Sequence, residues 1–219
     1  MPPLSPERAR RFYDRLGGGQ DWQRFYEDTA TRLLLAWGGF GDAEAVLELG
    51  CGTGRFAETL LARHLPADAR YTGIDLSPRM VDLTRARLAR WRDRADLRVG
   101  TAADAGAGGP DGTYDRVVAN YVFDLLGPDE TDAVLGEAHH LLRPGGRLCA
   151  TGLTFGINAR SRAVARAWSW LWRRAPGLVG GCRPIRLTDA LEPAAWRVER
   201  HETVTAWAVP SEVVVAVRS

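Results

Sequence analysis

The chain has 219 residues, with 29 Lys and Arg against 27 Asp and Glu, so its formal net charge is +2. All of these cations are arginines, since the sequence contains no lysine. A P-loop nucleotide site and a Schiff-base mechanism both need a lysine and are therefore excluded. The near-neutral balance also argues against a dedicated nucleic-acid-binding protein, which usually presents a strongly basic surface.

Hydrophobic residues make up 45% of the chain and charged residues 26%, as in ordinary soluble globular domains. The three cysteines, Cys51, Cys149 and Cys182, are odd in number and lack metal-ligand spacing. We therefore expect no disulfide framework, no metal site and a reducing compartment. The first residues do not resemble a signal peptide, and no apolar run is long enough to span a bilayer. These features together predict a cytoplasmic protein.

Two short helices are predicted in the first part of the chain. Ser5-Pro6-Glu7 is a helix start signal, and the glycine run at 17–19 ends that segment. A second apolar face at helical spacing extends from Trp22 to Trp37. We interpret residues 1–42 as an N-terminal helical cap and residues 43–219 as the main domain.

After this cap, strand-like and helix-like segments alternate. Strands are predicted at 46–49, 71–75, 97–100, 116–119 and 147–153, and helices at 55–63, 77–91 and 129–142. Alternation of this kind predicts a parallel sheet covered by helices on both faces.

The last part of the chain has a different pattern. An arginine- and tryptophan-rich helix is predicted from Arg160 to Arg174. Two strand-like runs follow, Trp196 to Trp207 and Val213 to Val217. Pro210-Ser211 separates these runs, so we expect an antiparallel hairpin with its turn at that dipeptide.

A glycine-rich motif, Glu48-Leu49-Gly50-Cys51-Gly52-Thr53-Gly54, ends the first predicted strand and opens a helix. Glycines at this point let the backbone turn tightly and approach a ligand, and the helix start offers free N–H groups. A dinucleotide fingerprint would need Gly or Ala at position 55, where this chain has Arg55. Asp75 ends the second strand about twenty residues further on, where an acid can accept both hydroxyls of a ribose.

Four segments in this order and spacing resemble the signature segments of class I S-adenosylmethionine-dependent methyltransferases. They are VLELGCGTGRFAETLL, YTGIDLSPRMV, PDGTYDRVVANYVFDLL and LLRPGGRL, within Val46 to Leu153. The small-molecule branch, which includes quinone-biosynthesis and phospholipid methyltransferases, is the most similar. The resemblance implies a Rossmann-like, seven-stranded, mostly parallel sheet with helices on both faces and a C-terminal antiparallel hairpin. It also implies S-adenosylmethionine as the cofactor.

The resemblance also implies a set of cofactor-binding residues. Those around the amino-acid end of the cofactor would be Glu48, Gly50, Gly52 and Gly54, with Cys51 as a small filler in the loop. Asp75 would bind the ribose, and Leu76 and Met80 would lie near the adenine. The residue that recognises the adenine amine stays open between Thr101, followed by Ala102, and Asp104. Asn120 and Tyr121, at the end of the fourth strand, would lie close to the reactive methyl group.

Aromatic rings can stabilise a sulfonium by cation–π attraction, and Tyr13, Tyr26 and Tyr121 are the candidates. The alternative for Tyr13 and Tyr26 is simple packing of their helices. A sulfonium methyl is already electrophilic, so the absence of an obvious general base does not argue against this chemistry. The N-P-P-[YF] motif of nucleic-acid and protein amine methyltransferases is absent, because the sequence after the fourth strand reads Asn120-Tyr121-Val122-Phe123.

The sequence thus predicts a methyltransferase that acts on N or O of a small molecule. One alternative is a quinone or phospholipid methyltransferase working at a membrane surface, with the basic, aromatic helix Arg160 to Arg174 at that surface. The favoured interpretation of that helix is ordinary packing between the fifth strand and the hairpin. Two further hypotheses are a nicotinamide-dependent dehydrogenase, which Arg55 argues against, and a non-catalytic cofactor-binding module.

Overall fold

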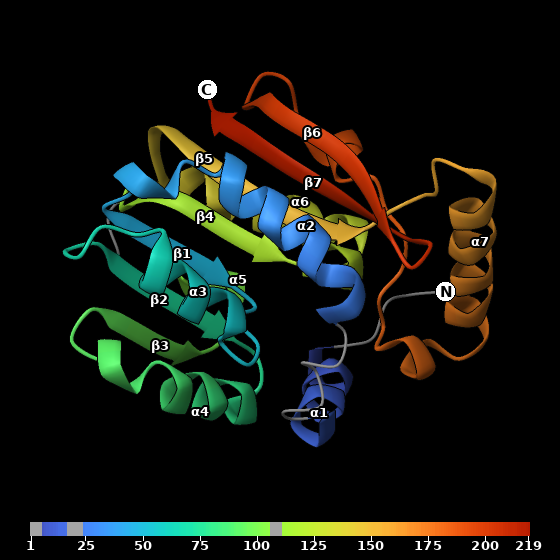
Figure 1. Cartoon of the computed structure of the whole chain (residues 1–219), viewed down its shortest axis with the longest axis horizontal. Helices are drawn as coiled ribbons and strands as arrows, with labels where there is room; N and C mark the ends of the chain where they lie inside the picture. Colours follow the sequence, from blue (N-terminus) through green and yellow to red (C-terminus); the bar gives the residue numbers. More distant parts are fainter. Residues whose placement is uncertain (1–5, 17–23, 106–110) are drawn as a thin grey trace.

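The computed structural model describes residues 6–16, 24–105 and 111–219 and contains one seven-stranded sheet, shown in Figure 1. The strand order across the sheet is β3-β2-β1-β4-β5-β7-β6. The strands are β1 (Ala45–Leu49), β2 (Arg70–Asp75), β3 (Ala95–Val99), β4 (Tyr114–Asn120), β5 (Leu142–Leu153), β6 (Trp196–Ala206) and β7 (Val209–Arg218).

Helices connect the strands and precede the sheet. The α-helices are α1 (Pro6–Leu16), α2 (Arg24–Trp37), α3 (Arg55–Arg63), α4 (Pro78–Arg87), α5 (Ala102–Ala105), α6 (Pro128–Leu141) and α7 (Ala159–Arg174). Short 3₁₀ segments are η2 (Phe40–Asp42), η3 (Ala89–Trp91), η4 (Phe123–Leu125), η5 (Pro176–Val179) and η6 (Leu187–Ala190). The predicted helix at 77–91 is thus shorter than expected, because α4 ends at Arg87 and η3 follows.

The pairing of the strands confirms the predicted fold class. β1 lies parallel to both β2 and β4, and parallel pairing continues outward to β3 and β5. β7 runs antiparallel to both β5 and β6, so the last two strands form a hairpin at one side of the sheet. The sheet is therefore Rossmann-like and mostly parallel, with a C-terminal antiparallel hairpin.

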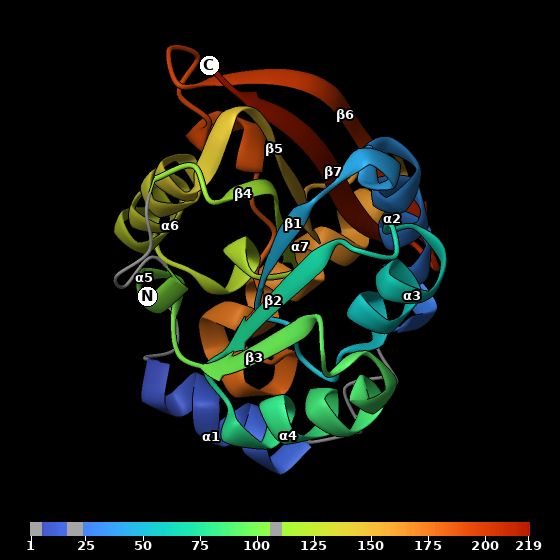
Figure 2. The same cartoon turned by 90° about the vertical axis from the view of Figure 1, so that its left-hand side faces the viewer.

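Side chains alternate between two apolar layers, one on each face of the sheet. Val46 of β1 packs in the layer that contains Ala30 and Leu34 of α2 and Leu60 of α3. The next residue, Leu47, packs in the opposite layer, which α6 covers. Figure 2 shows α2 and α3 on one side of the sheet and α5 and α6 on the other. Helix α2 is therefore part of the main core, and the predicted division at residue 42 stays a prediction.

The turn of the C-terminal hairpin differs from the prediction. It lies at Trp207-Ala208, and Pro210 and Ser211 belong to β7, where they pair with β6. Both turn residues have positive φ, 53° for Trp207 and 64° for Ala208. A two-residue hairpin turn with this geometry matches the right-handed twist of the strands, but it usually contains Asn or Gly. The sequence therefore carried no turn signal at the true position.

Arg116 of β4 joins the segment after α2 to the sheet. Its guanidinium donates to the carbonyl oxygens of Gly38 and Gly39 and pairs with Asp42, although only 3% of Arg116 is exposed. The neighbouring Asp115 carboxylate accepts the backbone N–H of Glu44 at 2.6 Å. These contacts fix how the chain enters β1, and therefore where the glycine-rich loop begins.

We expect Arg116→Leu to lower the free energy of unfolding by about 3–5 kcal/mol, because the buried Asp115 carboxylate loses a cation and the carbonyl oxygens of Gly38 and Gly39 lose their donor. Chemical denaturation would measure this loss. Arg98→Leu is the matched control, because Arg98 is exposed and its pair with Asp96 lies at the surface, where such a pair contributes about 0–1 kcal/mol. Equal losses in the two variants would contradict the anchoring role of Arg116.

Candidate active site

The glycine-rich loop between β1 and α3 needs its glycines for conformational reasons. Gly50, Gly52 and Gly54 all have positive φ, at 68°, 53° and 77°. A Cβ on Gly50 would lie 2.7 Å from Cγ2 of Val122, a distance that real Cβ atoms do not show. The loop therefore passes close to the end of β4, and only glycine allows both the turn and the close approach.

Asp75, at the end of β2, holds this loop in place. One carboxylate oxygen accepts the N–H of Gly52 at 2.9 Å, and the other accepts the N–H of Ser77 at 2.9 Å. Burial raises the pKa of Asp75, and the two N–H groups partly offset this effect. Each oxygen can accept a further hydrogen bond, so Asp75 can serve the loop and a ligand hydroxyl together.

Two adjoining cavities lie at the C-terminal ends of the strands, where ligands bind in open α/β sheets. Both are lined by Gly50, Asn120 and Tyr121. The first is small, about 70 Å³, and lies between the glycine-rich loop and α2. The second, about 480 Å³, extends along the ends of β2 and β3 towards α6. Together they form one elongated site.

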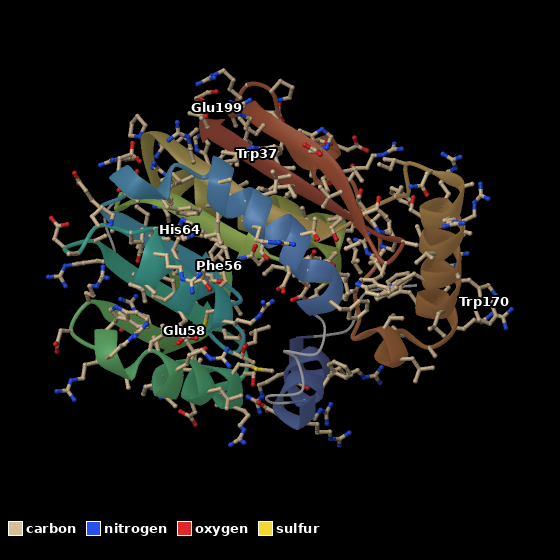
Figure 3. The ribbon with its side chains drawn as sticks, in the orientation of Figure 1. Trp37, Phe56, Glu58, His64, Trp170 and Glu199 are labelled. Carbon is tan, nitrogen blue, oxygen red and sulfur yellow. The ribbon has the colours of Figure 1, made fainter. Side chains whose placement is uncertain are left out.

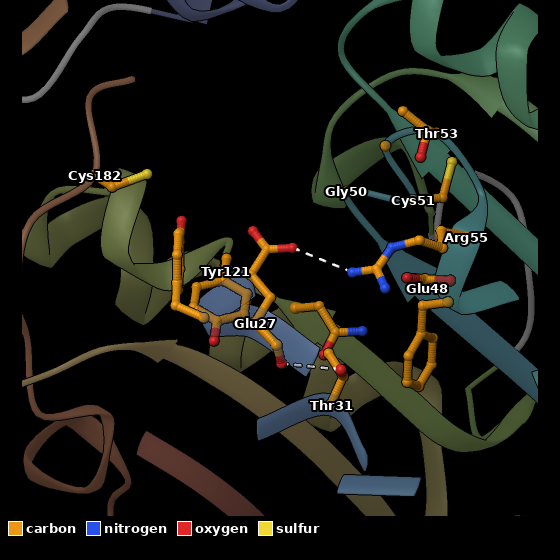
Figure 4. Close-up of a pocket in the computed structure, with 13 residues that line it drawn as sticks. Glu27, Thr31, Glu48, Gly50, Cys51, Thr53, Arg55, Tyr121 and Cys182 are labelled. Atoms are coloured by element: carbon orange, nitrogen blue, oxygen red, sulfur yellow. Dashed lines mark hydrogen bonds and ion pairs between the residues drawn. The ribbon is translucent and has the colours of Figure 1, made fainter. Parts of the chain in front are cut away.

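Charged side chains line the first cavity, as Figure 4 shows. Glu48 of β1 is 2% exposed and accepts the Tyr71 hydroxyl at 2.6 Å. Burial raises the pKa of Glu48 to about 8, although the Tyr71 hydrogen bond acts in the opposite direction. Arg55, at the start of α3, pairs with Glu27 of α2 at 3.5 Å and with Asp28. The cavity therefore presents carboxylates and a guanidinium side by side.

The sequence analysis did not identify Glu27 or Thr31 as site residues, and it considered Arg55 only as an argument against a dinucleotide site. All three line the first cavity. Thr31 and Glu27 lie one turn apart on α2, and the Thr31 hydroxyl donates to the Glu27 carbonyl oxygen at 3.0 Å. Glu27 carried no local signal in the sequence, because only the packing of α2 on the sheet brings its carboxylate to the glycine-rich loop.

The second cavity has a largely apolar wall. Its lining includes Leu76, Thr101, Ala102 and Val122. Asp104 is not part of this wall. Its carboxylate turns back and accepts the backbone N–H and hydroxyl of Thr101 at 2.6 and 2.8 Å, which lower its pKa. Of the two residues left open by the sequence, the structure therefore brings Thr101 to the cavity.

Two of the predicted residues, Gly54 and Met80, are not part of either described cavity wall. Gly54 packs against Thr84 behind the loop, and Met80 is buried in the first turn of α4. The side chain of Tyr13 lies outside the described residues. Burial raises the pKa of the Cys51 thiol, which lies 4.0 Å from the Thr84 hydroxyl, so Cys51 is a packed thiol in the loop. The roles of all these residues stay predictions.

Aromatic residues close the outer side of the first cavity. The ring of Tyr26 contacts Tyr121 and Trp168 edge to face, with centroids 5.7 and 6.3 Å apart. Tyr121 has a φ of 54°, which is uncommon outside glycine, and its hydroxyl donates to Ser211 at 2.9 Å. Burial raises the pKa of both Tyr26 and Tyr121 far above neutrality, so neither serves as a phenolate base.

Asn120 lies where the two cavities meet. Its Oδ1 accepts the Thr151 hydroxyl at 3.0 Å, which orients the side chain. Its Nδ2 faces the buried Glu48 carboxylate, and this contact acts against the rise that burial causes in the pKa of Glu48. Asn120 therefore connects the wall shared by the two cavities with the buried acid of the first one.

Comparison with known proteins points to one family. A family model described as a methyltransferase domain matches residues 47–148. Over 177 residues the chain is 34% identical to a trans-aconitate 2-methyltransferase of Methylobacterium radiotolerans, covering 78% of this chain and 62% of that protein. These comparisons support a class I S-adenosylmethionine-dependent methyltransferase. They confirm the resemblance found in the sequence motifs and argue against the dehydrogenase hypothesis.

Further proteins are similar to this chain in sequence or in fold. A demethylmenaquinone methyltransferase of Symbiobacterium thermophilum is 28% identical over 162 residues, covering 66% of this chain and 60% of that protein. This chain thus spans only 60–62% of the length of these two relatives. An O-methyltransferase family protein from Burkholderia thailandensis has a TM-score of 0.71 at 20% identity, covering 97% of this chain and 60% of that one. The [4+2]-cyclase SpnF has a TM-score of 0.75 at 16% identity, covering 100% of this chain and 98% of that one.

Two features are absent from the described part of the chain. None of its described helices is long and apolar enough to cross a bilayer. Within the same part of the chain, no group of three or more His, Cys, Asp or Glu could hold a metal ion.

The buried Glu48 predicts how stability depends on pH. Its pKa rises from 4.5 to about 8 on folding, so the folded protein binds a proton that the unfolded chain releases. The stability associated with the neutral form is complete below the unfolded pKa and is lost as pH rises through about 8. Asp124, with a pKa of about 7, acts in the same direction.

We therefore expect the free energy of unfolding to fall between about pH 5 and pH 8, and Glu48→Gln to flatten this fall. Denaturant titrations across that range would measure the slope. Glu58→Gln is the control, because Glu58 is a partly exposed acid on α3 and its variant should follow the wild type. A Glu48→Gln slope equal to that of the control would contradict a neutral buried Glu48.

Proposed function

We propose that the chain transfers a methyl group from S-adenosylmethionine to N or O of a small-molecule acceptor. One observation carries the proposal: the order of chemical groups along the two cavities. Carboxylates and a guanidinium line the first cavity, Asp75 lies in the middle, and an apolar wall follows. The cofactor has a matching order of groups. Its amino-acid end is charged, its ribose carries hydroxyls, and its adenine is a flat, largely apolar ring.

The residues present fit this cofactor. Glu48 and Glu27 suit its ammonium and Arg55 its carboxylate, while Asp75 suits the ribose hydroxyls and Thr101 the adenine edge. The fit rests on the space next to Gly50, which a Cβ would fill, and on the buried Glu48 carboxylate in the wall of the first cavity. When bound, the cofactor supplies an activated sulfonium methyl for in-line displacement.

The acceptor side is apolar and aromatic. A small cluster made by Tyr26, Leu153, Cys182 and Val209, with Tyr121 and Trp168 packed against it, forms part of the wall of the first cavity through Tyr26, Tyr121 and Cys182. These side chains exclude water and favour an acceptor with a flat or apolar body. By their names, the matched relatives act on trans-aconitate and on demethylmenaquinone, which are both small molecules.

The role of the chain in the reaction is mainly to position its ligands. Tyr26 and Tyr121 stay protonated at neutral pH, so they contribute their rings and hydroxyl hydrogens. Aromatic rings attract a nearby cation, and a dry wall strengthens that attraction. The acceptor atom must therefore arrive with a free lone pair, which favours neutral amines and hydroxyls acidic enough to ionise before they bind.

A second candidate is a cofactor-binding protein that catalyses another reaction or none. The similarity to the [4+2]-cyclase SpnF favours this second candidate, because the same fold occurs there in a protein named for a different chemistry. Both candidates predict cofactor binding. They differ in whether a labelled methyl group leaves the cofactor.

We expect S-adenosylhomocysteine to bind in isothermal titration calorimetry, and Asp75→Ala to weaken this binding by at least about tenfold through loss of a charged hydrogen-bond acceptor. Asp82→Ala is the control, because Asp82 is exposed on α4 and pairs with the surface Arg85. Melting temperatures would verify that both variants are folded. Absence of binding to the wild-type protein would rule out the proposed function.

We also expect transfer of a radiolabelled methyl group from S-adenosylmethionine to some member of a panel of amines, phenols, carboxylic acids and quinols. A Tyr26→Ala variant should lose transfer more than it loses cofactor affinity, because Tyr26 faces the acceptor side as well as the first cavity. Equal losses in both quantities would contradict an acceptor-side role for Tyr26. Cofactor binding with no transfer across the panel would favour the second candidate.

A further inference from the structure

Helix α7 has an inner side that the fold explains. The indole N–H groups of Trp168 and Trp172 donate to the carbonyl oxygens of Cys182 and Gly181 at 3.0 and 2.8 Å. Val164 and Trp168 also pack against the aromatic cluster of the acceptor side. This packing confirms the contact that the sequence analysis favoured for the helix, and it leaves the outer side unexplained.

The outer side of α7 carries a stripe of exposed side chains. Arg162, Arg166, Trp170 and Arg173 follow one another at spacings of four, four and three residues, so they share one face. All four are exposed, with Trp170 at 53%, and Figure 3 shows Trp170 on the side of α7 away from the sheet. We call these four residues the outer stripe.

The charge of this region is unbalanced. The segment from Arg160 to Arg186 contains 7 arginines and no acid, so the other 22 of the 29 cations face all 27 acids. Elsewhere, ion pairs engage arginines such as Arg55, Arg116 and Arg147. Within the described residues, no arginine of the segment from Arg160 to Arg186 has an acidic partner within ion-pair distance.

Exposed apolar side chains concentrate in the same region. Ile157 directly precedes the N-cap of α7 and is 58% exposed, and Leu178 of η5, just after the helix, is 75% exposed. Arg174 lies over the ring of Trp170, 5.4 Å from its centroid. An exposed Leu or Ile next to a basic helix is not explained by packing within the fold, and large exposed apolar groups of this kind mark interaction sites.

We propose that the outer stripe, flanked by Ile157 and Leu178, docks on a lipid bilayer that contains anionic headgroups. Unpaired arginines are attracted to such headgroups, while Trp, Ile and Leu side chains insert at the interface. These apolar side chains are spread along the 16 residues of α7 and its two ends. Shallow insertion fits that distribution better than a protein interface, which has one contiguous apolar centre.

The position of α7 gives the docking a consequence for the site. The inner side of the same helix contacts Tyr26 through Trp168, at the acceptor side of the cavities. A bilayer on the outer stripe would therefore lie one helix away from that side. This geometry suits an acceptor that is dissolved in the bilayer, although the docking itself does not rest on the proposed methyl transfer.

The test measures co-sedimentation of the full chain with sucrose-loaded vesicles. We expect binding to vesicles of phosphatidylcholine with about one third phosphatidylglycerol, little binding to phosphatidylcholine alone, and loss of binding at about 0.5 M NaCl. The double variant Arg166→Glu/Arg173→Glu should bind at least about tenfold more weakly, and Trp170→Ser about threefold or more.

The matched control is Arg85→Glu/Arg92→Glu, which changes the net charge equally but on exposed arginines around α4 and η3. It should bind as the wild type does, and circular dichroism melting curves would verify that every variant is folded. Equal loss in both double variants would overturn the proposal, since net charge alone would then explain binding. Absence of binding to anionic vesicles would also overturn the proposal. An acidic protein would then be the alternative partner of the outer stripe.

Discussion

Both oxygens of the Asp75 carboxylate accept backbone N–H groups, one from Gly52 in the loop after β1 and one from Ser77 at the start of α4. Parallel strands end at the same edge of a sheet, but nothing in the strand pairing alone fixes the loops that follow them. The carboxylate does so, because it connects the two loops between which the cavities open. The second lone pair of each oxygen would allow the same group to bind a ligand under the proposed function. Asp75 shares the ordering of the loop with the Thr84 hydroxyl, which donates to the Gly52 carbonyl oxygen at 2.7 Å.

The buried acids show that the site is built at some cost to stability. Glu48 is fully buried with a raised pKa, and Asp124 is buried with one carboxylate oxygen that has no hydrogen-bond partner among the described residues. An apolar pair of side chains would stabilise the fold better than these groups do. Under the proposed function, a cationic ligand would explain Glu48, because its ammonium would supply the missing countercharge. Asp124 lies behind the acceptor side, where the Arg183 guanidinium partly offsets the rise that burial causes in its pKa.

The sequence predicted the elements whose signals are local. The strands of the parallel sheet, the glycine-rich loop and Asp75 were all identified, because their patterns are short and each residue type has one conformational or chemical reason. Contacts that depend on tertiary packing could not be predicted. Glu27 reaches Arg55 only because α2 lies across the sheet, and Trp207-Ala208 forms the hairpin turn without the residues that usually signal it. Met80, which the resemblance placed near the adenine, is buried in the first turn of α4 and is not part of the described cavity walls.

Helix α7 has two faces with different roles, and the residues of both faces alternate along its sequence. Its tryptophans divide between the faces: Trp168 and Trp172 donate to backbone carbonyls on the inner side, and Trp170 lies outside among arginines. In a chain without lysine, every surface cation is a guanidinium, which stacks on aromatic rings and binds phosphate oxygens in pairs. Where such groups have acids beside them, as Arg55 and Arg147 do, their field is cancelled within the protein. Those on the outer stripe lack that cancellation among the described residues, and their field therefore extends outward from the helix that borders the acceptor side.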